Sequence, residues 1–502
     1  MNLHKILKKI SHNYQVFGDV SNLDSLELED ISIDSRKINK NTIFFGLIGQ
    51  KNDGANFLQD VANLGSKVAV ISQKSAFDFQ NFLKKNPQNT IIIGDVFEIL
   101  VEFLNIFYQP LPKNIYAITG TNGKTSTAEF TRQILQFLNK KSASIGTIGI
   151  NCDEEIKHNF EISNLTTPDI ISLYKNLAIL KKFAIDDVAI EVSSIGLDQR
   201  RIAGLEIAVG AFTNFTQDHL DYHQNMQKYF ECKMILFEKI VQKNGWAIVN
   251  SDIKEFSEIS KICQKNQLKI IDYGFQAQAL RLIKIDNQKV DFLYNQQQFS
   301  FTTNISGDFQ IFNILCALGN ILAKYNLSNE KIAELIKNFD KLQGASGRMQ
   351  KVCEHLGAKI FIDFAHSPDA IENVLKLAKN IAKNRVIILF GCGGDRDAKK
   401  RPIMGEIACA NADLVIVTDD NPRTENPALI RQEILQKCDH SKTLEIADRK
   451  IAIAKAIEIL QNDDILIIAG KGHENYQIIG SQKFEFNESE IIKNVIKKFS
   501  QS

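Results

Sequence analysis

The segment of this chain best suited to chemistry is a short glycine-containing loop. Gly120-Thr121-Asn122-Gly123-Lys124-Thr125 comes after the apolar run 115–118. In such a loop the backbone N–H groups, the positive end of the next helix and a lysine ammonium hold nucleotide phosphates, and a threonine hydroxyl reaches Mg²⁺. Two residues separate the first glycine from the Gly-Lys pair, where the usual phosphate loop has four. The sequence predicts a nucleotide-phosphate site with shortened spacing.

A carboxylate and an imidazole follow two further apolar runs. Glu191 comes after 188–190, and His219 lies in the polar stretch that follows 211–213. A carboxylate at a strand end beside a phosphate loop can bind the Mg²⁺ of a nucleotide, and a nearby imidazole can complete a second metal site. Taken alone, Glu191 is more often a solvated strand-end carboxylate. Its occurrence in one segment with the phosphate loop favours metal binding.

Buried strands are expected to carry these loops, because short apolar runs alternate with helical patterns along the chain. The expected strands are 42–47, 68–72, 90–93, 115–119, 188–192, 209–213, 246–250, 386–390, 414–418 and 465–469. Ile134, Leu135 and Leu138 form an apolar helical stripe after the phosphate loop. Strand-loop-helix units build parallel sheets with helices on both faces and ligands at the carboxyl ends of the strands. The sequence therefore predicts an α/β protein.

The length of 502 residues predicts about three domains. Gln109-Pro110-Leu111-Pro112 is typical of a linker, and a second segment closes near Gln343-Gly344. We therefore place the domains at 1–112, 113–344 and 345–502. The formal net charge of +1 gives no overall attraction for nucleic acid or an anionic membrane.

The eight cysteines show no close metal-ligand pair, so buried, reduced thiols are expected. No apolar run is long enough to span a bilayer, and the N-terminus lacks the apolar core of a signal peptide. We expect a soluble protein of the cytoplasm.

Several motifs together resemble one family. They are Gly120 to Thr125, Thr166-Thr167-Pro168-Asp169, Glu191-Val192-Ser193-Ser194, Asp218-His219-Leu220-Asp221-Tyr222-His223, Gly347-Arg348-Met349, Asp363-Phe364-Ala365-His366-Ser367-Pro368-Asp369, Gly391-Cys392-Gly393-Gly394-Asp395-Arg396-Asp397, Asp420-Asn421-Pro422-Arg423 and Gly470-Lys471-Gly472-His473-Glu474. In this order they resemble the Mur ligase family over nearly the whole chain. The resemblance implies a small N-terminal UDP-binding α/β domain, a central P-loop ATPase-like domain with a parallel sheet, and a C-terminal Rossmann-like domain.

The resemblance also implies a reaction. It is the ATP-dependent addition of meso-diaminopimelate to the D-Glu of UDP-N-acetylmuramoyl-L-alanyl-D-glutamate through an acyl phosphate, in peptidoglycan biosynthesis. ATP is the co-substrate, Mg²⁺ the cofactor and these small molecules the partners. Neither nucleic acid nor membrane insertion is expected, and the protein is expected to be a monomer.

Several residues match the ATP and metal sites of the family. The ATP set is Gly120, Thr121, Asn122, Gly123, Lys124, Thr125, Ser126, Asn313 at the adenine and Arg348 at the phosphates. Thr125 and Glu191 match ligands of the ATP-bound metal, and His219 and Lys233 match ligands of a second one. By its residue type and helical context alone, Lys233 would be a solvated surface cation. The resemblance reverses that interpretation and implies a lysine carbamylated by CO₂, which requires a neutral amine whose pKa is lowered by shielding from water. Lys124, Lys233, Glu191 and His219 form the implied catalytic set.

The remaining matches concern the acceptor and the amino acid. Ser35 and Gln50-Lys51-Asn52 match contacts to the UDP moiety, while Thr166, Thr167, Ser193, Gln199 and Arg201 match contacts to the muramoyl dipeptide. The diaminopimelate set is Arg396, Asp420, Asn421, Pro422, Arg423, Gly470 and Glu474. Arg423 would meet the distal carboxylate, which lysine lacks, and Glu474 the distal ammonium. His366 and Asp363 resemble interdomain contacts near ATP.

The chain departs from the family pattern at four positions. Leu165 stands where many relatives have Asn, Ile195 replaces a usual His, Ser367 replaces Thr, and Gln350 stands where an acid is common. A folate-polyglutamylating ligase, a nucleotide-binding regulatory protein that has lost catalysis and an NTPase switch remain alternatives. The UDP-binding segments disfavour the folate-polyglutamylating ligase, and the intact catalytic set disfavours the regulatory protein. The shortened loop and the third domain disfavour the NTPase switch.

Overall fold

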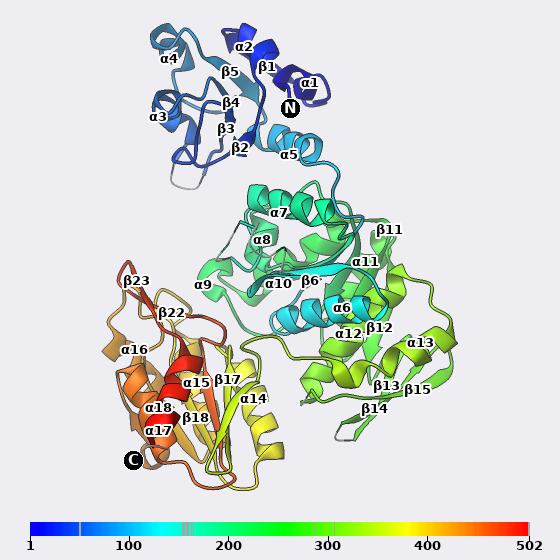
Figure 1. Cartoon of the computed structure of the whole chain (residues 1–502), viewed down its shortest axis with the longest axis vertical. Helices are drawn as coiled ribbons and strands as arrows, with labels where there is room; N and C mark the ends of the chain where they lie inside the picture. The colour runs from blue at the N-terminus through cyan, green and yellow to red at the C-terminus, as the bar shows by residue number, and fades with distance from the viewer. Residues whose placement is uncertain are drawn as a thin grey trace.

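A computed structural model of the chain describes residues 1–49, 52–152, 156, 160–161, 163, 165–286, 288–305 and 307–499. Over these ranges the strands form sheets of five, ten, six and two strands. In Figure 1 the three larger sheets lie one after another along the colour gradient, each with its own helices. Within the described ranges, no helix is long and apolar enough to cross a membrane.

The N-terminal sheet has the strand order β1-β5-β4-β3-β2 and is parallel except for β1. Its elements are α1 (Leu3–Leu7), β1 (Tyr14–Gly18), α2 (Ser21–Ser25), β2 (Asp30–Ser32), β3 (Thr42–Gly46), α3 (Leu58–Asn63), β4 (Val68–Ser72), α4 (Phe79–Lys85), β5 (Thr90–Gly94) and α5 (Val96–Phe107). Figure 1 shows this sheet at one end of the molecule, with α5 leading toward the central sheet. The strands expected at 42–47, 68–72 and 90–93 are confirmed within one residue at each end.

The central sheet has the strand order β15-β14-β13-β12-β11-β10-β6-β9-β7-β8. Its elements are β6 (Asn114–Thr119), α6 (Lys124–Phe137), β7 (Ser142–Gly146), β8 (Gly149–Asn151), α7 (Ile170–Lys182), β9 (Asp187–Glu191), α8 (Ser194–Asp198), β10 (Ile207–Phe212), α9 (Leu220–His223), α10 (Met226–Ile235), β11 (Val241–Asn250), α11 (Phe256–Lys265), β12 (Lys269–Gly274), β13 (Leu280–Asp286), β14 (Lys289–Tyr294), β15 (Gln297–Thr302), α12 (Asp308–Lys324) and α13 (Asn329–Ile336). The strands from β12 through β7 are parallel. The expected parallel sheet is therefore confirmed.

The register of the central strands explains why the predicted chemistry meets at one edge. On β6, Ile118 pairs with Glu191 of β9, and Thr119 pairs with Phe212 of β10. Because these strands are parallel, their carboxyl ends lie together. The same edge of the sheet therefore carries the phosphate loop, Glu191 and the segment after β10.

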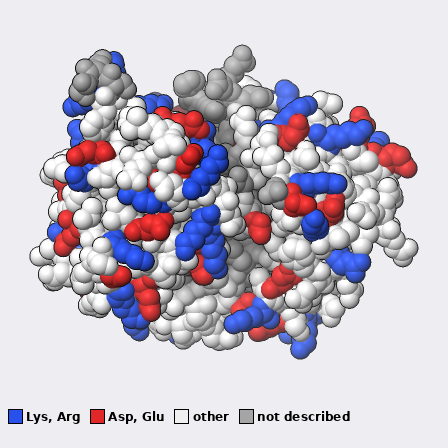
Figure 2. All heavy atoms as spheres, turned by 90° about the horizontal axis from the view of Figure 1, so that it is seen from below, with Lys and Arg blue, Asp and Glu red and all other residues white. Residues whose placement is uncertain are grey.

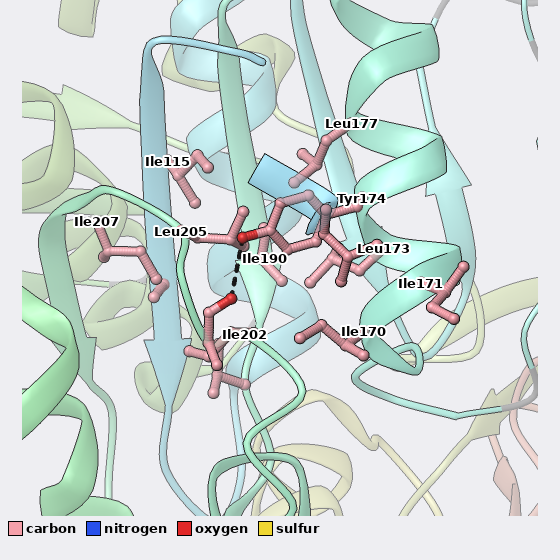
Figure 3. Close-up of a cluster of buried hydrophobic side chains, with 14 of the residues drawn as sticks. Ile115, Ile170, Ile171, Leu173, Tyr174, Leu177, Ile190, Ile202, Leu205 and Ile207 are labelled. Atoms are coloured by element: carbon pink, nitrogen blue, oxygen red, sulfur yellow. Dashed lines mark hydrogen bonds between the residues drawn. The ribbon is translucent and has the colours of Figure 1, made fainter. Parts of the chain in front are cut away.

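Helices on both faces hold this sheet. The predicted stripe on α6 is confirmed, since Ile134 and Leu135 are fully buried and Leu138 is partly buried against α12 and the sheet. On the other face, Asp169 caps the N-terminus of α7, and its carboxylate accepts hydrogen bonds from Ile171 N and Ser172 N. Figure 3 shows the buried side chains of α7 packed on those of the strands.

The C-terminal sheet has the strand order β16-β17-β21-β18-β19-β20, and a small hairpin lies beside it. Its elements are β16 (Gln350–His355), β17 (Ala358–Asp363), α14 (Pro368–Ile381), β18 (Val386–Phe390), α15 (Lys400–Asn411), β19 (Leu414–Val417), α16 (Pro427–Leu435), β20 (Thr443–Glu445), α17 (Arg449–Glu458), β21 (Ile465–Ala469), the hairpin β22 (Tyr476–Ile479) and β23 (Gln482–Glu485), and α18 (Glu488–Phe499). All strands of the six-stranded sheet except β16 are parallel. The expected strands at 386–390 and 465–469 are confirmed to the residue.

The predicted linker 109–112 lies between α5 and β6, and 343–344 lies between α13 and β16. The domain limits themselves stay a prediction. Six of the eight cysteines are buried, and Cys353 and Cys438 are partly buried. On the face drawn in Figure 2, basic and acidic side chains are interspersed, which agrees with a net charge near zero.

Candidate active site

A cavity of about 640 Å³ lies where loops of the central and C-terminal sheets face each other. From the central sheet it is lined by the phosphate loop, Thr147, Thr166, Glu191, Ser193, Asp218 and His219. From the C-terminal sheet it is lined by Arg348, His366, Arg396, Lys400, Asp420, Asn421, Arg423, Gly470, His473 and Glu474. Among the described residues, none before Thr121 lines it. One cavity thus contains the predicted phosphate and metal residues of the central domain and the predicted amino-acid residues of the C-terminal domain.

The phosphate loop is shaped by two glycines. Gly120 has φ of 142°, and a Cβ there would lie 1.9 Å from Thr213 Oγ1. Gly123, which immediately precedes α6, has φ of 85°, and a Cβ there would lie 2.3 Å from Asn313 Oδ1. Glycine is therefore needed at both positions, for conformation and for space. Lys124 Nζ donates to Gly120 O at 2.9 Å and to Thr121 O at 2.7 Å, so the ammonium lies over the loop.

Glu191 is a buried carboxylate held by hydroxyl and backbone donors. Its side chain accepts from Thr125 Oγ1 at 2.9 Å, from Thr147 N at 2.8 Å and from Thr147 Oγ1 at 3.1 Å. It is 1% exposed, and Lys124 and Arg348 are the cations whose charges interact with it among the described residues. A buried carboxylate is stable only when positive charge compensates it, so a cation bound at Thr125 and Glu191 fits this site.

No three His, Cys, Asp or Glu side chains of the described ranges gather as a metal cluster. Mg²⁺ does not require one, because it keeps several waters and binds phosphate oxygens beside one or two protein ligands. Thr125 and Glu191 together satisfy that requirement.

Lys233 lies on α10 and is 1% exposed, with Nζ donating to Gly120 O at 2.8 Å and lying 4.5 Å from the centre of the Tyr229 ring. Burial, aided by the charge of Lys124, places the pKa of Lys233 well below its ordinary value. The surface position suggested by residue type alone is wrong, and the shielded amine implied by the family is what the structure has.

His219 immediately precedes α9 and has φ of 52°. Burial lowers the pKa of His219 to about 4, so its imidazole is neutral at pH 7 and keeps a lone pair. His219 and Lys233 thus both lie beside the phosphate loop, and their binding of a second metal stays a prediction.

Asp218 connects the two domains. His366 Nε2 lies 3.5 Å from its carboxylate and Lys400 Nζ lies 3.4 Å from it, both from the C-terminal sheet. Burial opposes ionisation of Asp218, but His219, His366 and Lys400 hold its pKa well below the usual range. His366 is therefore an interdomain contact, as expected.

Arg348 also crosses between the domains, because its Nη2 donates to Thr125 Oγ1 at 3.2 Å. Its guanidinium stacks on Phe364, 4.7 Å from the ring centre. The hydrogen bonds of Asp363 remain inside the C-terminal domain, where it accepts from Met349 N and Ala365 N. Asp363 nevertheless lines a small cavity together with Asn122, Gly123 and Ser126 of the central domain, so it lies at the domain boundary and fixes the backbone beside Arg348.

A second cavity, of about 290 Å³, adjoins the phosphate loop and is lined by Asn122, Gly123, Thr213, Asn214, Asn250, Asp252, Phe309, Phe312, Asn313 and Asn373. Asn313 Nδ2 donates to Gln310 Oε1, and its Oδ1 accepts from Thr127 Oγ1. Phenyl rings and amides suit a flat heterocycle such as a purine base. Ser126 is buried at the start of α6, in a smaller cavity with Asn313 and Arg348.

The predicted acceptor residues divide into two groups. The hydroxyl oxygens of Thr166 and Thr147 lie 3.1 Å apart, and since Thr147 donates to Glu191, Thr166 is the donor of this pair. Thr167 Oγ1 donates to Glu191 O at 3.0 Å and accepts from Ser193 N. Arg201 Nη1 donates to Thr167 O at 2.7 Å, and its other nitrogens bind Gln199 Oε1. These residues surround the Glu191 strand end.

The second group lies in the N-terminal domain. Ser35 follows β2 and Asn52 precedes α3, away from the cavity lining. Gln50 and Lys51 lie outside the described residues. Of the predicted UDP contacts that the structure describes, Ser35 and Asn52 do not line the cavity at the phosphate loop.

The predicted diaminopimelate residues follow three parallel strands of the C-terminal sheet. Asn421 Nδ2 donates to Glu474 Oε2 at 2.9 Å, and Arg423 Nη1 donates to Gly394 O at 2.6 Å. Arg423 pairs in register with Ile479 of the hairpin. Burial and the charge of Arg396 lower the pKa of Arg423. Gly470 has φ of 114°, and a Cβ there would lie 2.4 Å from Asp420 Oδ2. Pro422 shapes the same turn without lining the cavity.

Sequence reasoning did not assign a role to several polar residues that line the cavity, among them Thr147, Asp218 and Lys400. Asp218 stood next to the predicted His219, which was a usable signal. Lys400 belongs to the run Lys399-Lys400-Arg401, which is typical of an exposed helix. Thr147 has no local signal, because its role depends on pairing between β7 and β9.

A phosphate loop with a buried carboxylate, closed by a second α/β domain, defines a multidomain α/β protein with a nucleotide-phosphate site between two domains. The sequence matches the Mur ligase middle domain over residues 118–321 and the Mur ligase, glutamate ligase domain over 347–472. A UDP-N-acetylmuramoyl-L-alanyl-D-glutamate--2,6-diaminopimelate ligase from Rickettsia bellii is 40% identical over 471 residues, which are 92% of this chain and 95% of that protein. This chain belongs to the Mur ligase family.

Solved structures agree with that assignment. One UDP-N-acetylmuramoyl-L-alanyl-D-glutamate--2,6-diaminopimelate ligase superimposes with a TM-score of 0.64 at 27% identity, over the full length of both chains. The MurF ligase from Thermotoga maritima in complex with ADP shares the fold, with a TM-score of 0.64 at 15% identity over 94% of this chain and 98% of that one. The expected three-part Mur ligase architecture is therefore confirmed.

Proposed function

We propose that this chain joins meso-diaminopimelate to the D-Glu carboxylate of UDP-N-acetylmuramoyl-L-alanyl-D-glutamate, converting ATP to ADP and phosphate, as a step of peptidoglycan biosynthesis. Family membership and the 40% identity to a ligase of that name support the reaction. The observation that carries the proposal is the hydrogen bond from Arg348 to Thr125, because it brings the C-terminal domain onto the phosphate loop.

In the first step, one oxygen of the D-Glu carboxylate attacks the γ-phosphorus of ATP, giving an acyl phosphate and ADP. Both reactants are anions, so catalysis is mainly positioning and charge neutralisation. Lys124 and the amides of the loop bind the phosphates, and Arg348 supplies a second cation from the other domain. The cavity beside Asn313 suits the adenine.

In the second step, an uncharged amine of diaminopimelate attacks the acyl carbon. The tetrahedral intermediate releases inorganic phosphate and leaves an amide. Thr166, Thr167 and Ser193 surround the Glu191 strand end and are proposed to orient the acceptor, with Gln199 and Arg201 behind them. Ser35, Gln50, Lys51 and Asn52 are proposed to hold the UDP end in the N-terminal domain.

Thr125 and Glu191 would hold a Mg²⁺ on the ATP phosphates, and His219 with Lys233 would hold a second one. When bound, these ions neutralise the charge that develops on the transferred phosphoryl group. Lys233 would serve as a carbamate, formed when its neutral amine attacks CO₂ and loses a proton. The burial and lowered pKa of Lys233 support that modification.

The diaminopimelate is proposed to lie between Arg396 and Arg423 on one side and Asp420 and Glu474 on the other. Arg423 would pair with the distal carboxylate and Glu474 with the distal ammonium. Asn421 and Gly470 complete this site, and Pro422 shapes its turn. The domain limits 1–112, 113–344 and 345–502, a monomeric state and action in the cytoplasm complete the proposal.

ADP release tests this function. The purified protein should release ADP when ATP, Mg²⁺, the UDP-dipeptide and meso-diaminopimelate are all present, and omission of any one should abolish release. Release that depends on a folate and glutamate, or that needs no acceptor, would overturn the proposal in favour of another ligase or an NTPase.

A further inference from the structure

Lys471 places a fully buried ammonium behind the amino-acid side of the cavity. Its side chain is 0% exposed, and Nζ donates to Asn421 Oδ1 at 2.8 Å and to Tyr476 O at 2.8 Å. Neither the cavity lining nor the predicted ligand set contains it. A charge at this depth is stable only if its neighbours compensate it.

The first neighbour is the side-chain amide of Asn421. Its oxygen accepts from Lys471 Nζ and also from Ile478 N at 2.9 Å, and its nitrogen donates to Glu474 Oε2 at 2.9 Å. Turning the amide over would place its NH₂ group against two donors and lose all three bonds. Lys471 therefore fixes the orientation of the amide that holds Glu474.

The other neighbours are two carboxylates. Lys471 Nζ lies 3.7 Å from Asp420 Oδ1 and 3.8 Å from Glu474 Oε2. Burial and the charge of Asp420 raise the pKa of Glu474, whereas Lys471 and Arg423 oppose that rise. Without the ammonium, two acidic groups would face each other in a partly dry site, and Glu474 would be harder to ionise.

We propose that Lys471 is a positioning residue for amino-acid selection: it holds the Asn421 amide and the Glu474 carboxylate in the arrangement that receives the ammonium of a diamino acid. This inference rests on the proposed function. It assigns Lys471 no contact with substrate.

The backbone around Lys471 is held independently of its side chain. Arg449, itself fully buried, donates from Nη2 to Ala469 O at 2.7 Å and pairs through Nε with Glu488 Oε1 at 2.7 Å. The strand end before Gly470 is thus fixed from behind. Replacing the Lys471 side chain should disturb Asn421 and Glu474 more than the strand.

The test is Lys471→Met, which keeps length and apolar volume and removes the ammonium. We expect KM for meso-diaminopimelate to rise about tenfold or more, while KM for ATP and for the UDP-dipeptide stays within about twofold, because the lost interactions lie on the amino-acid side alone. Lys455→Met is the matched control, since Lys455 is an exposed lysine of the same domain paired with Glu458. It should leave all three KM values unchanged.

A double-mutant cycle separates positioning from a general loss of structure. If Lys471 acts through Glu474, then Glu474→Gln should have much less effect in the Lys471→Met background than in the wild type. If Lys471→Met does not fold, Lys471→Gln, which keeps a donor but lacks the charge, takes its place in the same measurements. An unchanged KM for meso-diaminopimelate, an equal rise of all three KM values, or additive effects of the two substitutions would overturn the inference. A wild-type protein without amino-acid-dependent ADP release would instead refute the proposed function.

Discussion

Replacing Arg423 with alanine should remove most of the preference for meso-diaminopimelate over L-lysine. Arg423 uses Nη1 on Gly394 O, and within the described part of the chain its Nε and Nη2 make no hydrogen bond. Asp420 and Glu474 lie close enough to stabilise its charge, while Arg396 opposes it. The free donors are therefore available to a carboxylate that enters the cavity.

The size of the effect follows from the half-buried position of this guanidinium. A charge-assisted pair of this kind contributes about 2–4 kcal/mol, which corresponds to roughly 30- to 1,000-fold in kcat/KM. Lysine has no second carboxylate, so the wild type should prefer meso-diaminopimelate by about that factor. The backbone of Arg423 has φ of 50°, and alanine keeps the same strain, so the substitution mainly removes the charge.

The assay is ADP release at saturating ATP and UDP-dipeptide, with kcat/KM measured separately for the two amino acids. In Arg423→Ala the preference should fall to within about tenfold, through loss of activity with meso-diaminopimelate. Arg431→Ala is the matched control, because Arg431 pairs with Asp419 and Glu445 away from the cavity lining. A variant that keeps the wild-type preference would refute the role given to Arg423.

Three other perturbations have defined outcomes. Lys233→Ala should lower kcat by at least about a hundredfold, because a neutral methyl group cannot form the proposed carbamate; wild-type turnover would exclude the modification. Burial lowers the pKa of His473 to about 4 in the folded protein, whereas the pKa is about 6.5 in the unfolded chain. Between these two pH values the unfolded chain binds a proton at His473 that the folded protein does not bind. The free energy of unfolding should therefore fall as pH drops from 6.5 toward 4. The Tm of His473→Gln should fall less than that of the wild type over this pH range. An equal dependence of Tm on pH in the two proteins would contradict the lowered pKa of His473. Tyr174→Phe should reduce the free energy of unfolding by about 1–2 kcal/mol, since the buried Tyr174 hydroxyl donates to Ala203 O at 3.0 Å (Figure 3). Chemical denaturation measures this free energy, and an unchanged value in the variant would contradict the contribution of this hydrogen bond.

Apolar runs made the strands predictable, because strands buried on both faces are continuous apolar segments. The runs 386–390 and 465–469 became β18 and β21 without change. The polar segments that follow these strands were predictable as ligand-binding loops, because the carboxyl ends of parallel strands meet at one edge of the sheet.

The positions of single polar side chains were not predictable from local sequence. Lys233 has the residue type and the helical setting of a solvated cation, yet α10 packs it against the phosphate loop. Lys471 likewise gives no sign of its burial, which depends on the hairpin that returns over it. Such placements depend on tertiary packing, so they required either the structure or a family resemblance.

Transfer of an oxygen isotope tests the central claim most directly. The D-Glu carboxylate of the UDP-dipeptide is labelled with ¹⁸O, and the phosphate released with ATP, Mg²⁺ and meso-diaminopimelate is analysed by mass spectrometry. Formation of an acyl phosphate predicts one ¹⁸O in each phosphate released and the other in the new amide. Unlabelled phosphate would show that water, and not the carboxylate, attacks ATP at this site.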